Sequence, residues 1–139
     1  MYAKALLLAL LTQILLTIVL YLRLAIVKAR AVKAGQTDET RRALHADAWP
    51  EPVQQVNNCI RNQFEVPVLF HVSGLMLWQL GQTGPAVAIV AWLFVLSRIL
   101  HAREHCGRNH VPMRRRLFMF GCLMVLLLTL GAAFAVITG

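Results

Sequence analysis

The chain has 139 residues, of which 58% are apolar and only 14% are charged. Soluble globular domains use roughly 25% charged residues, so this composition excludes an ordinary water-soluble enzyme. The length allows a single domain over residues 1–139, and the formal net charge is +8.

The first predicted element is a membrane-spanning helix near the N-terminus. Ala5–Leu22 carries no charge over 18 positions, enough to begin crossing a hydrocarbon core about 30 Å thick. A cleaved signal peptide is the alternative, but its apolar core usually has only about 7–15 residues, and no small-residue cleavage pattern directly follows Leu22. We therefore expect a retained span at about residues 3–27, in a helix that stops near Gly35.

A polar, basic segment follows the first span. Residues 28–55 include Pro50 and Pro52, so they predict a loop, with a short helix at Thr40–Ala46.

A second long helix is predicted from about Val53 to Leu80, with its membrane span at about residues 56–80. Pro67 lies inside this helix. It should cause a kink or free a backbone carbonyl, which membrane helices tolerate.

Two further spans complete the expected fold. Gly81–Pro85 has the composition of a tight turn, and Gly107 is a suitable C-cap for a third helix spanning about residues 85–105. Pro112 lies near the first turn of a last helix, which spans about residues 115–137. The sequence therefore predicts an all-α membrane protein, a four-helix antiparallel transmembrane bundle.

The basic residues have a distribution that predicts orientation in the membrane. Of the 14 Lys and Arg, 13 lie at Arg23–Arg61 or Arg98–Arg116, around the two polar connections. A nucleic-acid partner is the competing interpretation of the positive charge. The positive-inside rule explains the distribution more simply, because it places the loop 28–55 and the second basic connection in the cytoplasm. Both termini are then non-cytoplasmic, and we expect no nucleic-acid partner.

Four polar residues share one face of the second predicted helix. Asn58, Arg61, Asn62 and Glu65 stand at offsets 0, 3, 4 and 7. The bland interpretation is a structural salt bridge between Arg61 and Glu65, which are four residues apart. Two amides on the same face favour a binding site, because they add donors and acceptors that suit a small, zwitterionic, peptide-like ligand.

The third predicted helix carries a second polar set, namely Arg98, His101, His105 and Arg108. The two histidines have the i, i+4 spacing of metal ligands. However, His-Ala-Arg-Glu-His is not the His-Glu-x-x-His pattern, and no carboxylate shares their face, so hydrogen bonding to a ligand or across helices is the better interpretation. We expect no metal. His71 is interpreted as a satisfied residue inside the bundle.

Three consecutive arginines, Arg114, Arg115 and Arg116, open the last predicted helix. At a membrane interface they can simply anchor the span to anionic head groups. The functional alternative is that one of them points inward and stabilises an anion.

Three short motifs together resemble a known membrane family. They are Arg61-Asn62-Gln63-Phe64-Glu65, Arg98-Ile99-Leu100-His101 and Pro112-Met113-Arg114. Their order and spacing are similar to the MAPEG proteins, which include microsomal glutathione transferases and the leukotriene and prostaglandin synthases. The resemblance implies four membrane helices, a homotrimer and glutathione as co-substrate, and we expect a bacterial member in the inner membrane.

The resemblance also assigns site residues. Arg61, Asn62 and Glu65 would contact glutathione with support from His101, and Arg114 would stabilise the thiolate as the catalytic residue. An arginine of the neighbouring subunit's first helix, here Arg23, would complete the site. Asn58, His105, Arg115 and Phe118 replace an Arg, a Tyr, a Ser and a Tyr of the prostaglandin synthase.

The residues and the resemblance lead to the same expected chemistry. The chain would be a membrane glutathione transferase or peroxidase-like protein, with Asn58, Arg98 and His105 as further binding residues. It would activate a thiol for attack on a lipophilic small molecule that arrives from the membrane lipid. The alternatives are a related membrane enzyme with another substrate and a non-catalytic scaffold or lipid- or anion-binding protein of the same fold.

Overall fold

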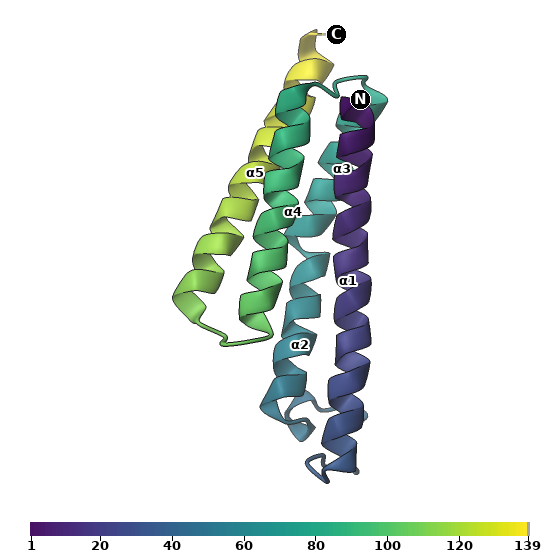
Figure 1. Ribbon diagram of the computed structural model, residues 1–139, viewed down its shortest axis with the longest axis vertical. Coiled ribbons are helices and arrows are strands. Elements are labelled where there is room, and N and C mark those ends of the chain that lie inside the picture. The colour runs from purple at the N-terminus through teal and green to yellow at the C-terminus, as the bar shows by residue number, and fades with distance from the viewer. Residues whose placement is uncertain (139) are drawn as a thin grey trace.

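The computed structural model describes residues 1–138 and contains only helices, turns and loops over that range (Figure 1). Its elements are α1 (Tyr2–Lys33), the 3-10 helix η1 (Ala46–Ala48), α2 (Glu51–Arg61), the 3-10 helix η2 (Asn62–Phe64), α3 (Val66–Gln79), α4 (Pro85–His105) and α5 (Val111–Thr138). Gly139, the last position of the expected domain, lies outside the described residues.

The first helix ends where the sequence predicts. Gly35 has a φ of +64°, a left-handed conformation that glycine adopts without strain. The Gly35 amide donates to the Val32 carbonyl and the Gln36 amide to the Ala31 carbonyl, each at 3.0 Å. This is a Schellman motif, so the stop at Gly35 is confirmed.

The loop after α1 differs from the prediction. No α-helix forms at Thr40–Ala46, because the Asp38 carboxylate instead accepts hydrogen bonds from the backbone amides of Thr40 and Arg41 and holds a turn. A salt bridge of 2.8 Å joins Arg41 to Asp47. The hydrogen bond from Arg41 keeps the pKa of the Asp47 carboxyl below its usual value.

The prediction of a single helix from Val53 to Leu80 is wrong, because this segment consists of two α-helices separated by a break. Helix α2 ends at Arg61, η2 follows, and Glu65 has φ −102° and ψ −105°, which is not helical. Pro67 explains the break: it has no amide hydrogen, and its ring clashes with the carbonyl four residues earlier, that of Gln63. The expected kink at this proline therefore becomes a full interruption.

Helices α4 and α5 form an antiparallel hairpin close to the predicted one. Gly107 sits just after α4, and a Cβ there would lie 2.8 Å from the Arg103 carbonyl oxygen, so the turn requires glycine. Asn109 adopts a left-handed φ of 57° in the same turn. Pro112 falls in the first turn of α5, as expected.

The helices pack as a four-membered bundle in one half of the molecule. Around it, α1 contacts α4, α4 contacts α5, α5 contacts α3, and α3 returns to α1 (Figure 1). Its core includes Leu6, Phe70, Phe94 and Leu128. In the other half α2 takes the place of α3 beside α1, and the first turns of α5 splay away from the bundle (Figure 1).

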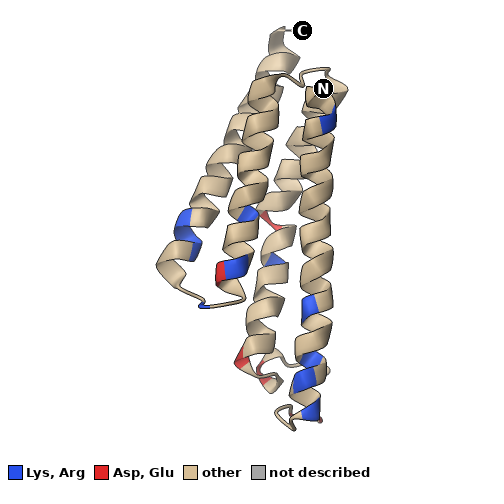
Figure 2. Ribbon diagram, viewed as in Figure 1, with Lys and Arg blue, Asp and Glu red and all other residues tan. Residues whose placement is uncertain are grey.

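Three of these helices, α1, α4 and α5, are long and apolar enough to cross a membrane. Helix α3 has 14 residues, which extend only about 21 Å. Figure 2 shows that charged residues gather in the α2 half of the molecule, with Lys4 as the exception near the N-terminus. The ends of α1 and α2 also project beyond the α4–α5 turn (Figure 1).

Candidate functional site

One face of the last turns of α4 carries buried polar side chains. Arg98 is 0% exposed, and His101 and His105 are each 2% exposed. Their spacing of three and four residues places them on the same side of the helix, as the sequence predicts. Burial of a charged guanidinium costs free energy unless the charge has a partner. The contacts of Arg98 therefore determine what this face of the helix can bind.

Arg98 reaches the helix break and the last helix. Its Nη2 donates to the backbone carbonyl of Asn62 at 3.0 Å, and its guanidinium lies 5.8 Å from the centre of the Phe118 ring. The i+4 hydrogen-bonding pattern changes at η2, which makes a carbonyl available to a side-chain donor. The Nε and Nη1 of Arg98 are buried and have no hydrogen-bond partner within residues 1–138. A cation with two unpaired donor atoms therefore lies beside the break.

The two histidines extend this unpaired polar surface. The rings of His101 and His105 meet edge to face, with centroids 5.5 Å apart, and His101 also lies against Phe118. The Nδ1 atom of each histidine is buried without a partner. Most buried polar atoms in proteins are hydrogen-bonded, so a cluster of exceptions indicates a ligand that is not part of the single chain.

Helix α5 closes the hollow next to this cluster. A cavity of about 290 Å³ is lined by Asn62, His101, Val111, Arg114, Arg115 and Phe118. Arg114 donates from Nη1 to the Asn109 side chain, and its buried Nε has no partner. Two of the three consecutive arginines thus face the hollow where the sequence analysis expected one, and Arg116 does not line it.

The remaining polar residues of the second helix lie outside this hollow. Asn58, Arg61 and Glu65 are exposed on the surface of the single chain. The salt bridge considered between Arg61 and Glu65 does not form: within residues 1–138 the salt bridges are Arg41–Asp47 and Arg42–Glu39. The break after Arg61 removes the continuous helix that would have aligned the pair.

Arg23 is placed on another side of α4. Its Nη2 donates to the Cys106 carbonyl at 2.7 Å, so it caps the C-terminal end of α4 in its own chain.

His71 is satisfied as predicted, with Nδ1 2.7 Å from the Pro67 carbonyl and Nε2 3.2 Å from the Leu10 carbonyl.

One side-chain contact that positions the site was not predicted from the sequence. Gln13 and Gln63 are both buried, and Gln13 Nε2 donates to Gln63 Oε1 at 2.8 Å. Gln63 also donates to the Cys59 carbonyl. This amide pair fixes α1 to the break beside Asn62. The available signal was Gln13 itself, an uncharged polar residue inside the first apolar run.

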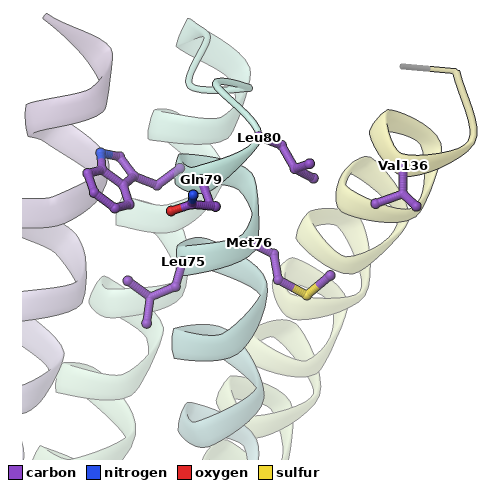
Figure 3. Close-up of a pocket in the computed structure, with 6 residues that line it drawn as sticks. Leu75, Met76, Gln79, Leu80 and Val136 are labelled. Atoms are coloured by element: carbon purple, nitrogen blue, oxygen red, sulfur yellow. The ribbon is translucent and has the colours of Figure 1, made fainter.

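A different hollow lies at the other end of the bundle, between α3 and α5 (Figure 3). It has a volume of about 500 Å³ and is lined by Leu75, Met76, Trp78, Gln79, Leu80 and Val136. None of these side chains ionises, so this hollow has no group that could activate a nucleophile. Within the described residues, no group of three or more His, Cys, Asp or Glu could hold a metal ion.

Comparison with known proteins gives the family. The sequence pattern that defines the MAPEG family matches residues 4–134, nearly the whole chain. The chain belongs to the MAPEG family. Neither the curated proteins nor the solved structures contain a match.

For this MAPEG protein, membership and the apolar helices together establish an integral membrane protein. The family is associated with glutathione, and the membership of this chain in the family fits a glutathione transferase-like or related membrane function. Each of the three sequence motifs contributes one lining residue to the hollow, namely Asn62, His101 and Arg114.

Proposed function

We propose that this MAPEG protein is a membrane glutathione transferase or peroxidase-like enzyme, which activates the thiol of glutathione for reaction with a lipophilic electrophile. The observation that carries the proposal is a hollow lined by His101 and Arg114, each of which has a buried nitrogen atom without a partner. Arg98 and His105, which contact residues that line the hollow, also have buried nitrogen atoms without partners. Such a cluster is suited to an anion, because leaving it empty is costly.

Arginine near the hollow would supply the activation. A thiol reacts as its thiolate, and an unperturbed cysteine thiol has a pKa of about 8.5 that nearby cations lower. Arginine keeps its charge in a poorly hydrated site where lysine can lose it. Arg114, which lines the hollow, would stabilise the sulfur anion once the thiol proton has left to water. The thiolate would then form a carbon–sulfur bond, either by displacing a leaving group that departs with its electron pair or by adding to an activated double bond whose carbanion takes a proton from water. With a hydroperoxide, the thiolate would attack an oxygen and break the O–O bond to release an alcohol, and a second glutathione would convert the resulting sulfenic acid to the disulfide and water.

The remaining residues fit a zwitterionic peptide. Arg61 can bind a carboxylate of glutathione, Glu65 its ammonium group, and the amides of Asn58 and Asn62 its peptide bonds. Glu65 is better suited to positioning than to chemistry, because a carboxylate near the sulfur would oppose the thiolate. Asn62 belongs to both groups: its backbone carbonyl accepts a hydrogen bond from Arg98, and the residue borders the hollow.

A homotrimer with four membrane spans per chain would complete the site. Arg61 and Glu65 are exposed in the single chain and lie at the break within the second predicted span. Charged side chains at membrane depth face protein or water rather than lipid, so a neighbouring copy would cover them. The resemblance assigns Arg23 of that neighbour to the site. With the basic connections in the cytoplasm, both termini lie on the opposite side of the membrane.

A non-catalytic role is favoured by one observation. The hollow is bordered by Phe118 and by no hydroxyl side chain, so no hydroxyl group could donate a hydrogen bond to the sulfur. An anion- or lipid-binding scaffold needs only the cations. Titration of the purified protein with glutathione, followed by the ultraviolet absorbance of the thiolate, separates the two. The enzyme should produce thiolate at saturating glutathione near neutral pH; a scaffold should produce none.

A further inference from the structure

A second basic cavity opens on the opposite side of α4 from the proposed site. It has a volume of about 560 Å³ and lies between α1, α4 and α5 at the level of the α4–α5 turn. At 3.6 residues per turn, Leu100 and Arg103 point away from the face that carries Arg98 and His101. The two cavities therefore share a helix but no lining residue.

The rim of this cavity is cationic. Arg103 and Arg108 are exposed and form no salt bridge within residues 1–138. Arg23 also lines it and uses one nitrogen for the Cys106 carbonyl. One carboxylate is present, that of Glu104, and it accepts a hydrogen bond from the backbone amide of His110. Three guanidinium groups against one carboxylate leave an excess of positive charge.

The floor of the same cavity is apolar. Leu100, Met113 and Leu117 line it, and Leu100 and Met113 are exposed in the single chain. A guanidinium rim above an aliphatic groove, between membrane helices and at the end of their apolar runs, matches a molecule that joins a phosphate to acyl chains. A soluble anion would use the rim and leave the groove unfilled.

We propose that this cavity binds one anionic phospholipid, with its phosphate between Arg103 and Arg108 and an acyl chain along Leu100 and Leu117. The inference does not rest on the proposed function, because Arg103, Arg108, Leu100 and Leu117 do not line the thiol hollow.

The test is native mass spectrometry of the protein in mild detergent with phosphatidylglycerol or phosphatidylcholine of identical acyl chains. The protein should retain phosphatidylglycerol preferentially. The double variant Arg103→Gln/Arg108→Gln should bind it about 25-fold more weakly, since each arginine near an anionic head group contributes roughly a factor of five. The control Lys33→Gln/Arg116→Gln removes equal charge from exposed positions outside the cavity and should change binding less than twofold.

A third variant keeps the proposal testable if the double variant does not fold. Glu104→Gln removes the only carboxylate in the cavity and should strengthen phosphatidylglycerol binding about fivefold. Equal retention of both lipids, an equal loss in the control, or full displacement of the lipid by millimolar inorganic phosphate would each overturn the proposal. Thiolate formation should persist in Arg103→Gln/Arg108→Gln, so failure of one proposal leaves the other intact.

Discussion

Arg98 and Arg114 carry the same charge in different surroundings. Arg98 is fully enclosed, bonds the Asn62 backbone and lies against Phe118, so its removal would disturb the fold. Arg114 is half-buried, lines the hollow and is anchored by Asn109, and its Nε has no partner within residues 1–138. The surroundings of Arg114 hold its charge in place and leave it able to bind an anion, which is what thiolate stabilisation requires.

Arg114→Ala should therefore lose thiolate formation while the fold is kept. Removing the cation should reduce the thiolate fraction at neutral pH by at least about tenfold. The measurement is the thiolate absorbance in a glutathione titration, with circular dichroism to check folding. Arg116→Ala is the matched control, since Arg116 lies two residues away and outside the hollow. Full activity of Arg114→Ala, or equal loss in both variants, would identify the arginines as a lipid anchor.

For Glu65 we predict a role in binding glutathione and no role in the stability of the fold. Because Glu65 forms no salt bridge within the described residues, Glu65→Gln should leave thermal stability unchanged. It should raise the Kd for glutathione by about tenfold through loss of one charged contact. Isothermal titration measures the affinity, and Glu51→Gln, at the start of α2, serves as the control. A change in melting temperature with unchanged affinity would show a structural role instead.

At the scale of elements, the break between α2 and α3 organises the site. Pro67 interrupts the helix, Asn62 offers its carbonyl to Arg98, and the Gln13–Gln63 pair ties the break to α1. Helices α1, α2 and α4 are thus joined by side-chain hydrogen bonds at one level. The break is a structural junction as well as a kink.

The amide pair can be tested by a double-mutant cycle. Gln13→Leu leaves the Gln63 carbonyl oxygen buried without its donor and should lower the free energy of unfolding by about 1 kcal/mol, within the range of hydrogen bonds between membrane helices. Gln13→Leu/Gln63→Leu removes both partners and should be more stable than the sum of the single losses predicts. Unfolding in mixed detergent measures each value; strictly additive losses would contradict the pairing.

The limits of prediction from sequence are also clearest at this scale. Hydropathy and caps located α1, α4 and α5 within a few residues, because Gly35, Pro85 and Pro112 act locally. The shared face of Arg98, His101 and His105 followed from helical spacing. The predicted pairing of Arg61 with Glu65 is wrong, because it assumed a continuous helix through a segment that Pro67 interrupts. The Gln13–Gln63 contact joins residues 50 positions apart and has no periodic signal.

At the scale of the whole molecule, charge divides the chain into two halves (Figure 2). One half has an apolar surface suited to lipid. The other contains the break, the arginine cluster and the exposed polar residues of α2. A single chain embedded in lipid would leave Arg61 and Glu65 at the membrane edge without protein cover.

Native mass spectrometry in mild detergent should therefore show a trimer. The physical reason is that association of copies covers polar groups that lipid cannot solvate. Glutathione should raise the stability of the trimer if the site lies between subunits, as ligand binding stabilises the state that holds the ligand. A stable monomer under conditions that preserve the fold would contradict both the assembly and the shared site.

The uneven ends of the helices have a consequence for how two unlike reactants could meet. Helix α1, with 32 residues, extends about 48 Å, longer than a hydrocarbon core of about 30 Å, while the α4–α5 turn stops short of its end (Figure 1). With the topology proposed above, the arginine hollow at that turn would lie at the boundary between lipid and water. A water-soluble tripeptide and an oil-soluble electrophile can each arrive from the phase that dissolves it, and neither has to cross the other's.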